Sequence, residues 1–232
     1  TDMLSTTPTY VGGLNACING QGFFATQAIS TKEIDVDGDA ADVTDALKKA
    51  EFAYTRVGQF QLDSQGYLTD GTNFIYGFRP DGNNGFKTGS LVALRVPSDL
   101  NNGFDDDALQ AASVKINELG EVTATVTNPD NGESVQVSLG KIAIVTFQNQ
   151  EGLMKSGGTY YSASIGDNTG LCSATIPGGS TSKLMTGYLE ASNVDLAKEF
   201  SEMITTQRGF QANTKMITVS DEILSDLISM KR

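Results

Sequence analysis

Short apolar runs separated by turn residues dominate the first 190 positions of the chain. Two of them, Val122 to Val126 and Val135 to Leu139, alternate strictly between apolar and polar residues. A period of two places successive side chains on opposite faces of a strand, so the pattern predicts a mainly β, antiparallel domain. The runs are residues 18–26, 52–62, 73–78, 91–96, 112–117, 122–127, 134–139 and 141–147.

Turn residues lie between these runs, where hairpins need them. The segment Asn128-Pro129-Asp130-Asn131-Gly132 separates the two alternating runs, and Asp70-Gly71 and Asp81-Gly82 end other runs. Asn, Asp and Gly tolerate the backbone angles of tight turns, and this supports antiparallel pairing. A short helix of one or two turns is expected at residues 42–49, and no other segment before residue 190 has the period of a long helix.

The pattern changes at Ser192, where a long amphipathic helix is predicted to begin. Ser192 with Asp195 three residues later resembles a capping box, and Lys231-Arg232 lie where the helix dipole favours cations. Apolar residues then recur at every seventh position, and the alternate positions of the seam are apolar only at its ends. We therefore predict a helix of coiled-coil character with a mixed seam. Its candidate assembly residues are Leu196, Phe200, Met203, Gln207, Phe210, Ile217, Leu224 and Ile228.

The length of this helix leaves two interpretations open. At about 1.5 Å per residue, residues 194–230 would form a rod of roughly 55 Å, longer than a 190-residue domain needs for its own core. Either the helix folds back onto the β domain, or it contacts other helices, which would be a missing helix of the same chain or copies of it. Gly209 costs about 1 kcal/mol relative to Ala in a helix interior, which favours the close approach of another backbone there.

Composition excludes several classes of function. The chain has 16 basic and 28 acidic side chains, a net charge of −12, a pI near 4.3 and no His. Without His there is no Ser/His/Asp or Cys/His catalytic group and no His-ligated metal. The acidity argues against nucleic acid or an anionic membrane surface as a partner, and no apolar run is long enough to span a membrane. A binding or structural role is favoured.

The cysteines and the chain start add little chemistry. Cys17 and Cys172 are 155 positions apart without a C-x-x-C motif, which is neither a disulfide framework nor a zinc pattern, and their pairing stays open. The start has neither a basic region nor an apolar region of a secretory signal. Because residue 1 is Thr and not Met, we expect the natural N-terminus to be missing.

Two motifs resemble ligand sites and depart from them. Gly20-Gln21-Gly22 lacks the third glycine of a dinucleotide loop, since position 25 is Ala, and instead predicts a strand entering the core at Phe23-Phe24. Residues 35–39 resemble a calcium loop, but the sixth and twelfth positions are Ala40 and Ala46. Isolated calcium sites stay open at Asp99, Asp105, Asp106 and Asp107. No cofactor or metal is implied, and no residue supports an enzyme.

Several longer segments resemble one known family. The C-terminal segment carries Ser192-Asn-Val-Asp-Leu196, Met203-Ile-Thr-Thr-Gln-Arg-Gly-Phe-Gln-Ala-Asn213, Asp221-Glu-Ile-Leu224 and Met230-Lys-Arg232. Upstream lie Ile18-Asn-Gly-Gln-Gly-Phe-Phe24, the pattern from Tyr54-Thr-Arg56 to Leu68, and Gly152-Leu153. These blocks are similar, in the same order, to the bacterial flagellar hook and rod family.

The resemblance implies three parts and a structural role. Residues 1–15 would be an extended linker toward an N-terminal helix that is missing here, residues 16–190 the β-rich body, and residues 191–232 the inner-tube helix. The Thr-Gln-Arg-Gly-Phe run and the final Met-Lys-Arg resemble a hook protein, in a short form without the outer domain. The length favours the alternative within the family, a distal-rod protein.

As a hook subunit, the chain would polymerise into the flexible tube that joins the basal-body rod to the filament. The resemblance implies other copies of itself, the adjoining rod and hook–filament junction proteins and the hook cap as partners. It also implies an extracellular location after export by the flagellar type III apparatus. The alternative from another class is a calcium-dependent β-rich surface adhesion module.

Overall fold

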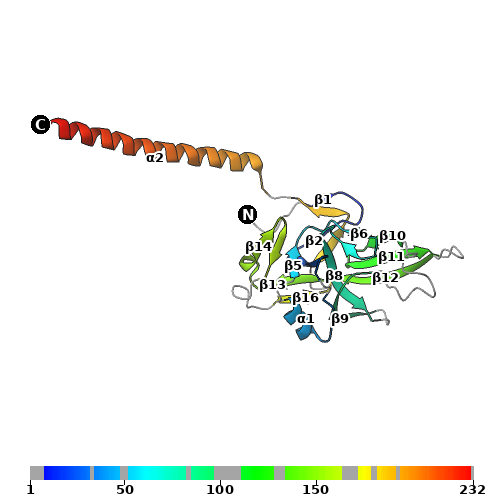
Figure 1. Cartoon of the computed structure of the whole chain (residues 1–232). Coiled ribbons are helices and arrows are strands. Elements are labelled where there is room, and N and C mark those ends of the chain that lie inside the picture. The colour runs from blue at the N-terminus through cyan, green and yellow to red at the C-terminus, as the bar shows by residue number, and fades with distance from the viewer. Residues whose placement is uncertain are drawn as a thin grey trace. The chain divides into compact units, whose positions relative to one another are not determined.

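The chain divides into two compact units, residues 2–191, called the body below, and residues 192–232. The computed structural model describes residues 8–31, 34–47, 52–81, 85–96, 111–127, 134–163, 172–178, 182–191 and 194–230 (Figure 1). Some predictions from the sequence lie outside the described residues. These are the turn at Asn128–Gly132, the Ser192 cap, the terminal Lys231-Arg232 pair and the acidic residues Asp99, Asp105, Asp106 and Asp107.

The body is β-rich, and every strand pairing in its described part is antiparallel, as the alternating runs predict. One short α-helix, α1 (Ala40–Leu47), and a 3₁₀ turn, η3 (Gln150–Gly152), accompany the strands. The strands are β1 (Pro8–Tyr10), β2 (Ala16–Asn19), β3 (Phe23–Ala28), β4 (Val36–Asp37), β5 (Phe52–Thr55), β6 (Gln61–Leu62), β7 (Leu68–Thr69), β8 (Asn73–Pro80), β9 (Phe86–Ala93), β10 (Ala111–Ile116), β11 (Glu121–Thr127), β12 (Ser134–Ile142), β13 (Ile144–Phe147), β14 (Met154–Gly157), β15 (Tyr160–Ser162), β16 (Cys172–Thr175), β17 (Lys183–Thr186) and β18 (Tyr188–Glu190).

The strands form one large sheet and two small ribbons. The main path of the large sheet runs β10-β11-β12-β8-β3-β5-β15-β14, and β13, β16, β4, β9, β6 and β7 join it off this path. The two ribbons are β17 with β2 and β1 with β18. The pairing of β1 and β18 aligns Pro8 with Glu190, so the segment expected as an extended linker contains a strand paired with the last strand of the body.

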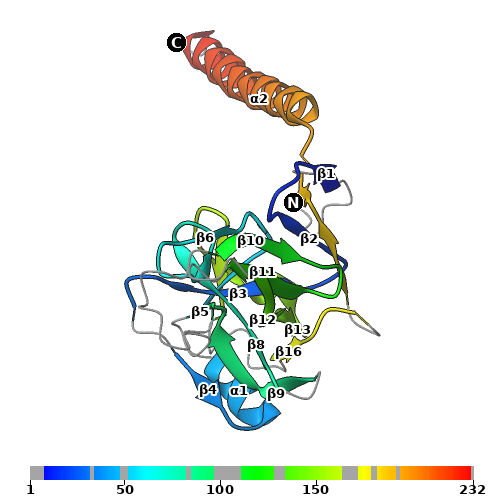
Figure 2. The ribbon, with the colours of Figure 1, turned by 90° about the vertical axis from the view of Figure 1, so that its right-hand side faces the viewer.

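The central strands of the large sheet are buried on both faces, which explains why several of them read as continuous apolar runs. Along β8, Phe74, Tyr76 and Phe78 belong to one core cluster and Ile75 belongs to a second. Helix α1 contributes Leu47 and other side chains to the first cluster and lies beside β4 and β9 (Figure 2). When both faces are buried, neither set of alternate positions needs to be polar.

Two predicted runs are each divided into separate strands. Residues 18–26 form β2 and β3, which belong to different sheets, with Gly20 and Gly22 between them at φ of +130°. An L side chain rarely adopts that angle, so this corner requires glycine. Residues 52–62 form β5 and β6. The expected strand entry at Phe23-Phe24 and the pairing of the runs at β11 and β12 are confirmed.

The acidic segment before α1 acts as a helix cap. The Asp39 carboxylate accepts hydrogen bonds from the amides of Ala41 and Asp42, at 2.8 and 3.2 Å. The Asp39 amide in turn donates to the Asp42 carboxylate at 3.1 Å. This reciprocal arrangement satisfies amides that have no partner within the helix, which gives the Asp-rich pattern a structural explanation.

The cysteines that the sequence left open do not form a disulfide. Cys17 and Cys172 are both buried thiols. Their Sγ atoms lie near different carbonyl oxygens, that of Ile18 at 3.7 Å and that of Thr44 at 3.6 Å.

Candidate assembly surface on the C-terminal helix

The C-terminal unit is a single helix, α2 (Leu196–Met230), of 35 residues. It begins four residues later than the predicted start at Ser192, because Asp195 is its cap. The Asp195 carboxylate accepts hydrogen bonds from the amides of Ala197 and Lys198, at 2.9 and 3.3 Å. An Asp at this position also interacts favourably with the positive end of the helix dipole.

All eight predicted assembly residues lie in α2, and all are exposed. Phe210 is 74% exposed and Ile217 is 64% exposed. With about 100° of rotation per residue, the eight positions fall within an arc of about 120° of the helix surface. They therefore share one face. Its apolar members, called the first strip below, are Leu196, Phe200, Met203, Phe210, Ile217, Leu224 and Ile228.

A second strip of apolar side chains follows the C-terminal half of α2, and the sequence reasoning missed it. Its members are separated by four or three positions and fall within an arc of about 80°, which lies about 80° to 160° away from Ile217. The signal was present in the sequence, but a search at every seventh position follows only one face. The members of the second strip are Ala212, Met216, Val219, Ile223, Leu227 and Met230.

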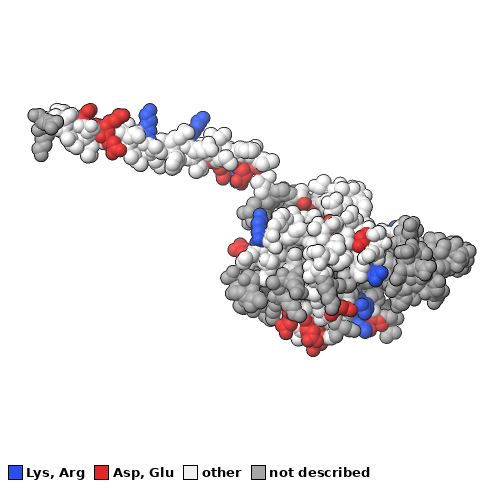
Figure 3. All heavy atoms as spheres, in the orientation of Figure 1, with Lys and Arg blue, Asp and Glu red and all other residues white. Residues whose placement is uncertain are grey.

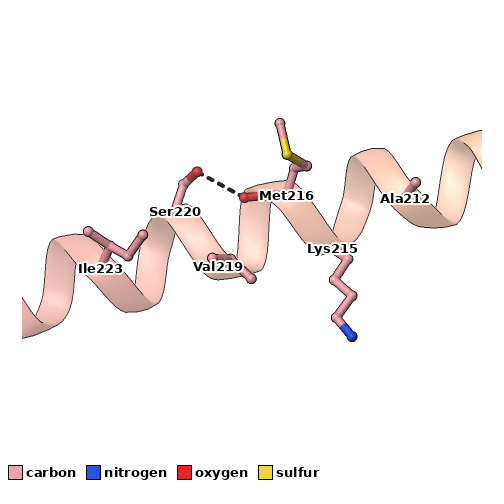
Figure 4. A pocket seen from close by; sticks show the side chains of 6 residues that line it. All are labelled: Ala212, Lys215, Met216, Val219, Ser220 and Ile223. Atoms are coloured by element: carbon pink, nitrogen blue, oxygen red, sulfur yellow. Dashed lines mark hydrogen bonds between the residues drawn. The ribbon is translucent and has the colours of Figure 1, made fainter.

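Figure 4 shows part of this second strip. Ala212, Met216, Val219 and Ile223 line a pocket on α2 together with Lys215 and Ser220. The Ser220 hydroxyl donates to the Met216 carbonyl oxygen at 2.8 Å, so its polar atom is satisfied within the helix. The pocket is therefore bordered by one cation and otherwise by apolar or internally satisfied groups.

Other hydroxyls of α2 are satisfied in the same way. Thr205, Thr206 and Thr214 donate to the carbonyl oxygens four residues earlier, at 2.9 to 3.0 Å. A hydroxyl that already has a partner loses less when a neighbouring surface displaces its water. Thr214, one of the polar positions of the seam, is thus compatible with burial against another helix.

Charged side chains are distributed along α2, and Figure 3 shows uncharged surface between them. The apolar side chains of this helix are all exposed, which is the chemistry of a contact surface. The described residues contain no group of three or more Cys, Asp or Glu side chains that could hold a metal ion. No described helix combines the length and the apolar character needed to cross a membrane. The charged residues of α2 are Lys198, Glu199, Glu202, Arg208, Lys215, Asp221, Glu222 and Asp226.

Comparison with known proteins identifies the family. Residues 185–230, which include β18 and α2, match the family described as flagellar basal body rod FlgEFG protein, C-terminal. The flagellar basal-body rod protein FlgG of Bacillus subtilis is 38% identical over 213 residues, covering 90% of this chain and 69% of that protein.

The chain belongs to the flagellar rod and hook family.

Hook proteins of this family are also similar, over shorter parts. FlgE of Treponema pallidum is 40% identical over 119 residues, which cover 51% of this chain and 24% of that protein. FlgE of Salmonella typhimurium is 35% identical over 148 residues, covering 64% of this chain and 30% of that protein. The chain therefore spans about two thirds of one rod relative and less than a third of these two hook relatives.

Membership of the rod and hook family confirms the resemblance drawn from the sequence. The relatives are structural proteins, so the prediction that the chain is not an enzyme is confirmed as well. Nothing in the comparisons supports the calcium-dependent adhesion module. The coiled-coil packing of α2 and the assembly role of the eight residues stay predictions.

Proposed function

We propose that this chain is a structural subunit of the flagellar rod and that copies of it assemble through α2. The observation that carries the assembly role is a 35-residue helix without a buried side chain, whose apolar residues form strips along its length. Isolated helices are only marginally stable in water, and helices in proteins gain most of their stability from the packing of an apolar face. A helix with this surface is best explained by contacts with other helices in a polymer.

The energetics support the first strip as an assembly surface. Fully burying one Leu, Ile, Phe or Met side chain contributes roughly 1.5–3 kcal/mol. The strip has seven such residues, so burial of only some of them offsets the entropy that a subunit loses on joining a polymer. Gln207 lies on the same face and would provide a polar contact that favours one register.

The extent of the similarity favours the rod over the hook. The alignment with the Bacillus subtilis rod protein extends over 90% of this chain, whereas those with the two hook proteins extend over 51% and 64%. The hook is the second candidate. It is favoured by the Thr-Gln-Arg-Gly-Phe run and by the 40% identity to the Treponema pallidum hook protein within the matched part. The hook cap, the junction proteins and type III export stay predictions from the family resemblance.

Fractionation distinguishes the two candidates. Hooks sheared from isolated hook–basal bodies would be separated from the basal bodies, and both fractions probed with an antibody against this chain. A rod subunit is expected in the basal-body fraction. Signal confined to the sheared hooks would instead support the hook, and absence from both fractions would refute a place in either structure.

The assembly surface is tested with Ile217→Asp in the chain expressed from its native gene. Asp221 already lies within the same arc, one turn from Ile217. A second carboxylate there would add like-charge repulsion to the cost of burying an unpaired charge at each subunit contact, so assembly should be lost. The matched control is Gln211→Asp, which adds the same charge outside both strips, beside Arg208 and Lys215, and should assemble. Assembly of the Ile217→Asp chain at wild-type levels would exclude the first strip as the interface.

A further inference from the structure

The Gly20-Gln21-Gly22 turn, which is no nucleotide loop, holds a buried arginine. Arg56 follows β5 directly and is 8% exposed. Its Nη1 donates to the Gly22 carbonyl oxygen at 2.7 Å, and its Nη2 donates to the carbonyl oxygens of Gly20 and Ile18, at 3.0 and 3.3 Å. The turn between β2 and β3 therefore forms a cradle of backbone oxygens around one guanidinium.

The fourth contact of Arg56 reaches the last strand of the body. Its Nε donates to the Glu190 carboxylate at 2.7 Å, and the two side chains are only 9% and 11% exposed. The Phe23 ring lies 6.0 Å from the guanidinium carbon. Charged hydrogen bonds of this kind are strong where water is excluded, and the guanidinium fork can satisfy several acceptors at once.

The position of Glu190 in the fold gives this contact its significance. Glu190 ends β18, six positions before α2 begins at Leu196. Strand β18 pairs with β1 in a separate two-stranded ribbon, called the exit ribbon below, and has no ladder pairing with the large sheet. Arg56, which follows a strand of the large sheet, thus joins that sheet to the ribbon from which the chain continues to α2.

We propose that Arg56 is a positioning residue that clamps the exit ribbon to the body, so that force on α2 is transmitted to the large sheet. The ion pair with Arg56 holds Glu190 in place, and the carbonyl oxygens of Gly20 and Gly22 hold Arg56 in place. When the pair breaks, the exit ribbon opens locally while the large sheet stays folded. The clamp itself depends only on the body, and its mechanical role rests on the proposed assembly function of α2.

Amide hydrogen exchange of the 232-residue chain tests the clamp without any polymer. The amides of Val11 and Gly12 both donate to the Gly187 carbonyl oxygen, at 2.8 and 2.9 Å, and report on the exit ribbon. The amides of Leu94 and Ala143, which donate to Ile75 and Tyr76, report on the large sheet. Local opening and global unfolding are thereby measured in one experiment.

In Glu190→Gln, exchange at Val11 and Gly12 is expected to rise roughly 30-fold or more, because one partner of a buried pair has lost its charge. Arg56→Lys should have a similar effect, since one ammonium cannot reach all four acceptors. The exchange rates of the Leu94 and Ala143 amides should change by less than about threefold in either variant. The control is Arg79→Lys. Arg79 lies 3.7 Å from Asp35 in an exposed ion pair, so this substitution should leave the exchange rates of both pairs of amides unchanged.

Two results would overturn the clamp. One is unchanged exchange at Val11 and Gly12 in Glu190→Gln, and the other is an equal rise at all four amides, which would make the pair a general stability element. The mechanical role has its own readout. Polymers of the Glu190→Gln chain should form but show a shorter persistence length in electron micrographs. An unchanged persistence length would refute the transmission of force through Arg56.

Discussion

The amide of Ala16 donates to the carbonyl oxygen of Gly58 at 2.8 Å, and the two backbones approach so closely that a Cβ on Gly58 would lie 1.8 Å from the Ala16 carbonyl oxygen. The Phe24 ring lies 3.1 Å from the same point. This contact joins the start of β2 to the segment after Arg56. The ribbon formed by β2 and β17 is therefore in direct backbone contact with the segment that follows β5.

Gly58→Ala should therefore destabilise the body, because a backbone oxygen cannot move aside as a flexible side chain can. We expect a loss of about 1–3 kcal/mol in the free energy of unfolding, measured by urea denaturation. Gly85→Ala is the matched control, since its nearest atom, Asp81 Cβ, would lie at an ordinary 3.9 Å, and it should change stability by less than about 0.5 kcal/mol. Equal effects of the two substitutions would contradict the steric explanation.

Gly209→Ala separates the stability of α2 from its assembly. Apart from Gly209, its chain neighbours and the adjacent helix backbone, no described atom lies within 4 Å of a Cβ at this position. The helix itself should therefore gain about 1 kcal/mol, seen as slower amide exchange in α2. If another subunit's backbone approaches Gly209, as the sequence suggests, polymer yield should fall at the same time. Gln211→Ala is the control, because it also raises helix propensity but lies outside both strips. Undiminished assembly of Gly209→Ala would argue against a close backbone contact.

Alkaline pH should destabilise the chain. Burial raises the pKa of Tyr54 and that of Tyr160, where the hydrogen bond to Asp70 adds to the effect. The folded state thus keeps protons that the unfolded chain loses above about pH 10, so stability falls as pH rises.

The buried Tyr54 alone would contribute a slope of up to about 1.4 kcal/mol per pH unit above that point. Urea melts between pH 8 and 11 measure the decline. Tyr54→Phe should be less stable at pH 8, because it loses the hydrogen bond to Leu47, but its decline should be shallower. Parallel curves for the two proteins would show that folding does not raise the pKa of Tyr54.

The two thiols should be unreactive in the folded chain. Burial raises the pKa of Cys17, and the nearby Glu190 carboxylate raises it further against the opposing effect of Arg56. Because the thiolate is the reactive form, Cys17 is protected both by low access and by a low thiolate fraction. Labelling with a thiol reagent at pH 8 should be slow in buffer and rapid, at two groups per chain, in guanidinium chloride. Rapid labelling of the native chain would indicate that β2 opens readily.

Elements with a local sequence pattern could be predicted without the structure. Strict alternation at Val122 to Val126 and Val135 to Leu139 predicted paired strands, because one face of that hairpin is polar. Leu196, Met203, Phe210, Ile217 and Leu224 predicted a long helix and one of its apolar faces. The blocks around these residues also sufficed to indicate the family.

Only the tertiary structure decided where those elements end and what they contact. The run at residues 18–26 appears continuous because β2 and β3 are each largely buried, and its division at Gly20 and Gly22 depends on which sheet each half joins. The pairing of Arg56 with Glu190 spans 134 positions. Such a contact leaves no periodic trace, because it is created by the fold bringing distant strands together and not by the preferences of neighbouring residues.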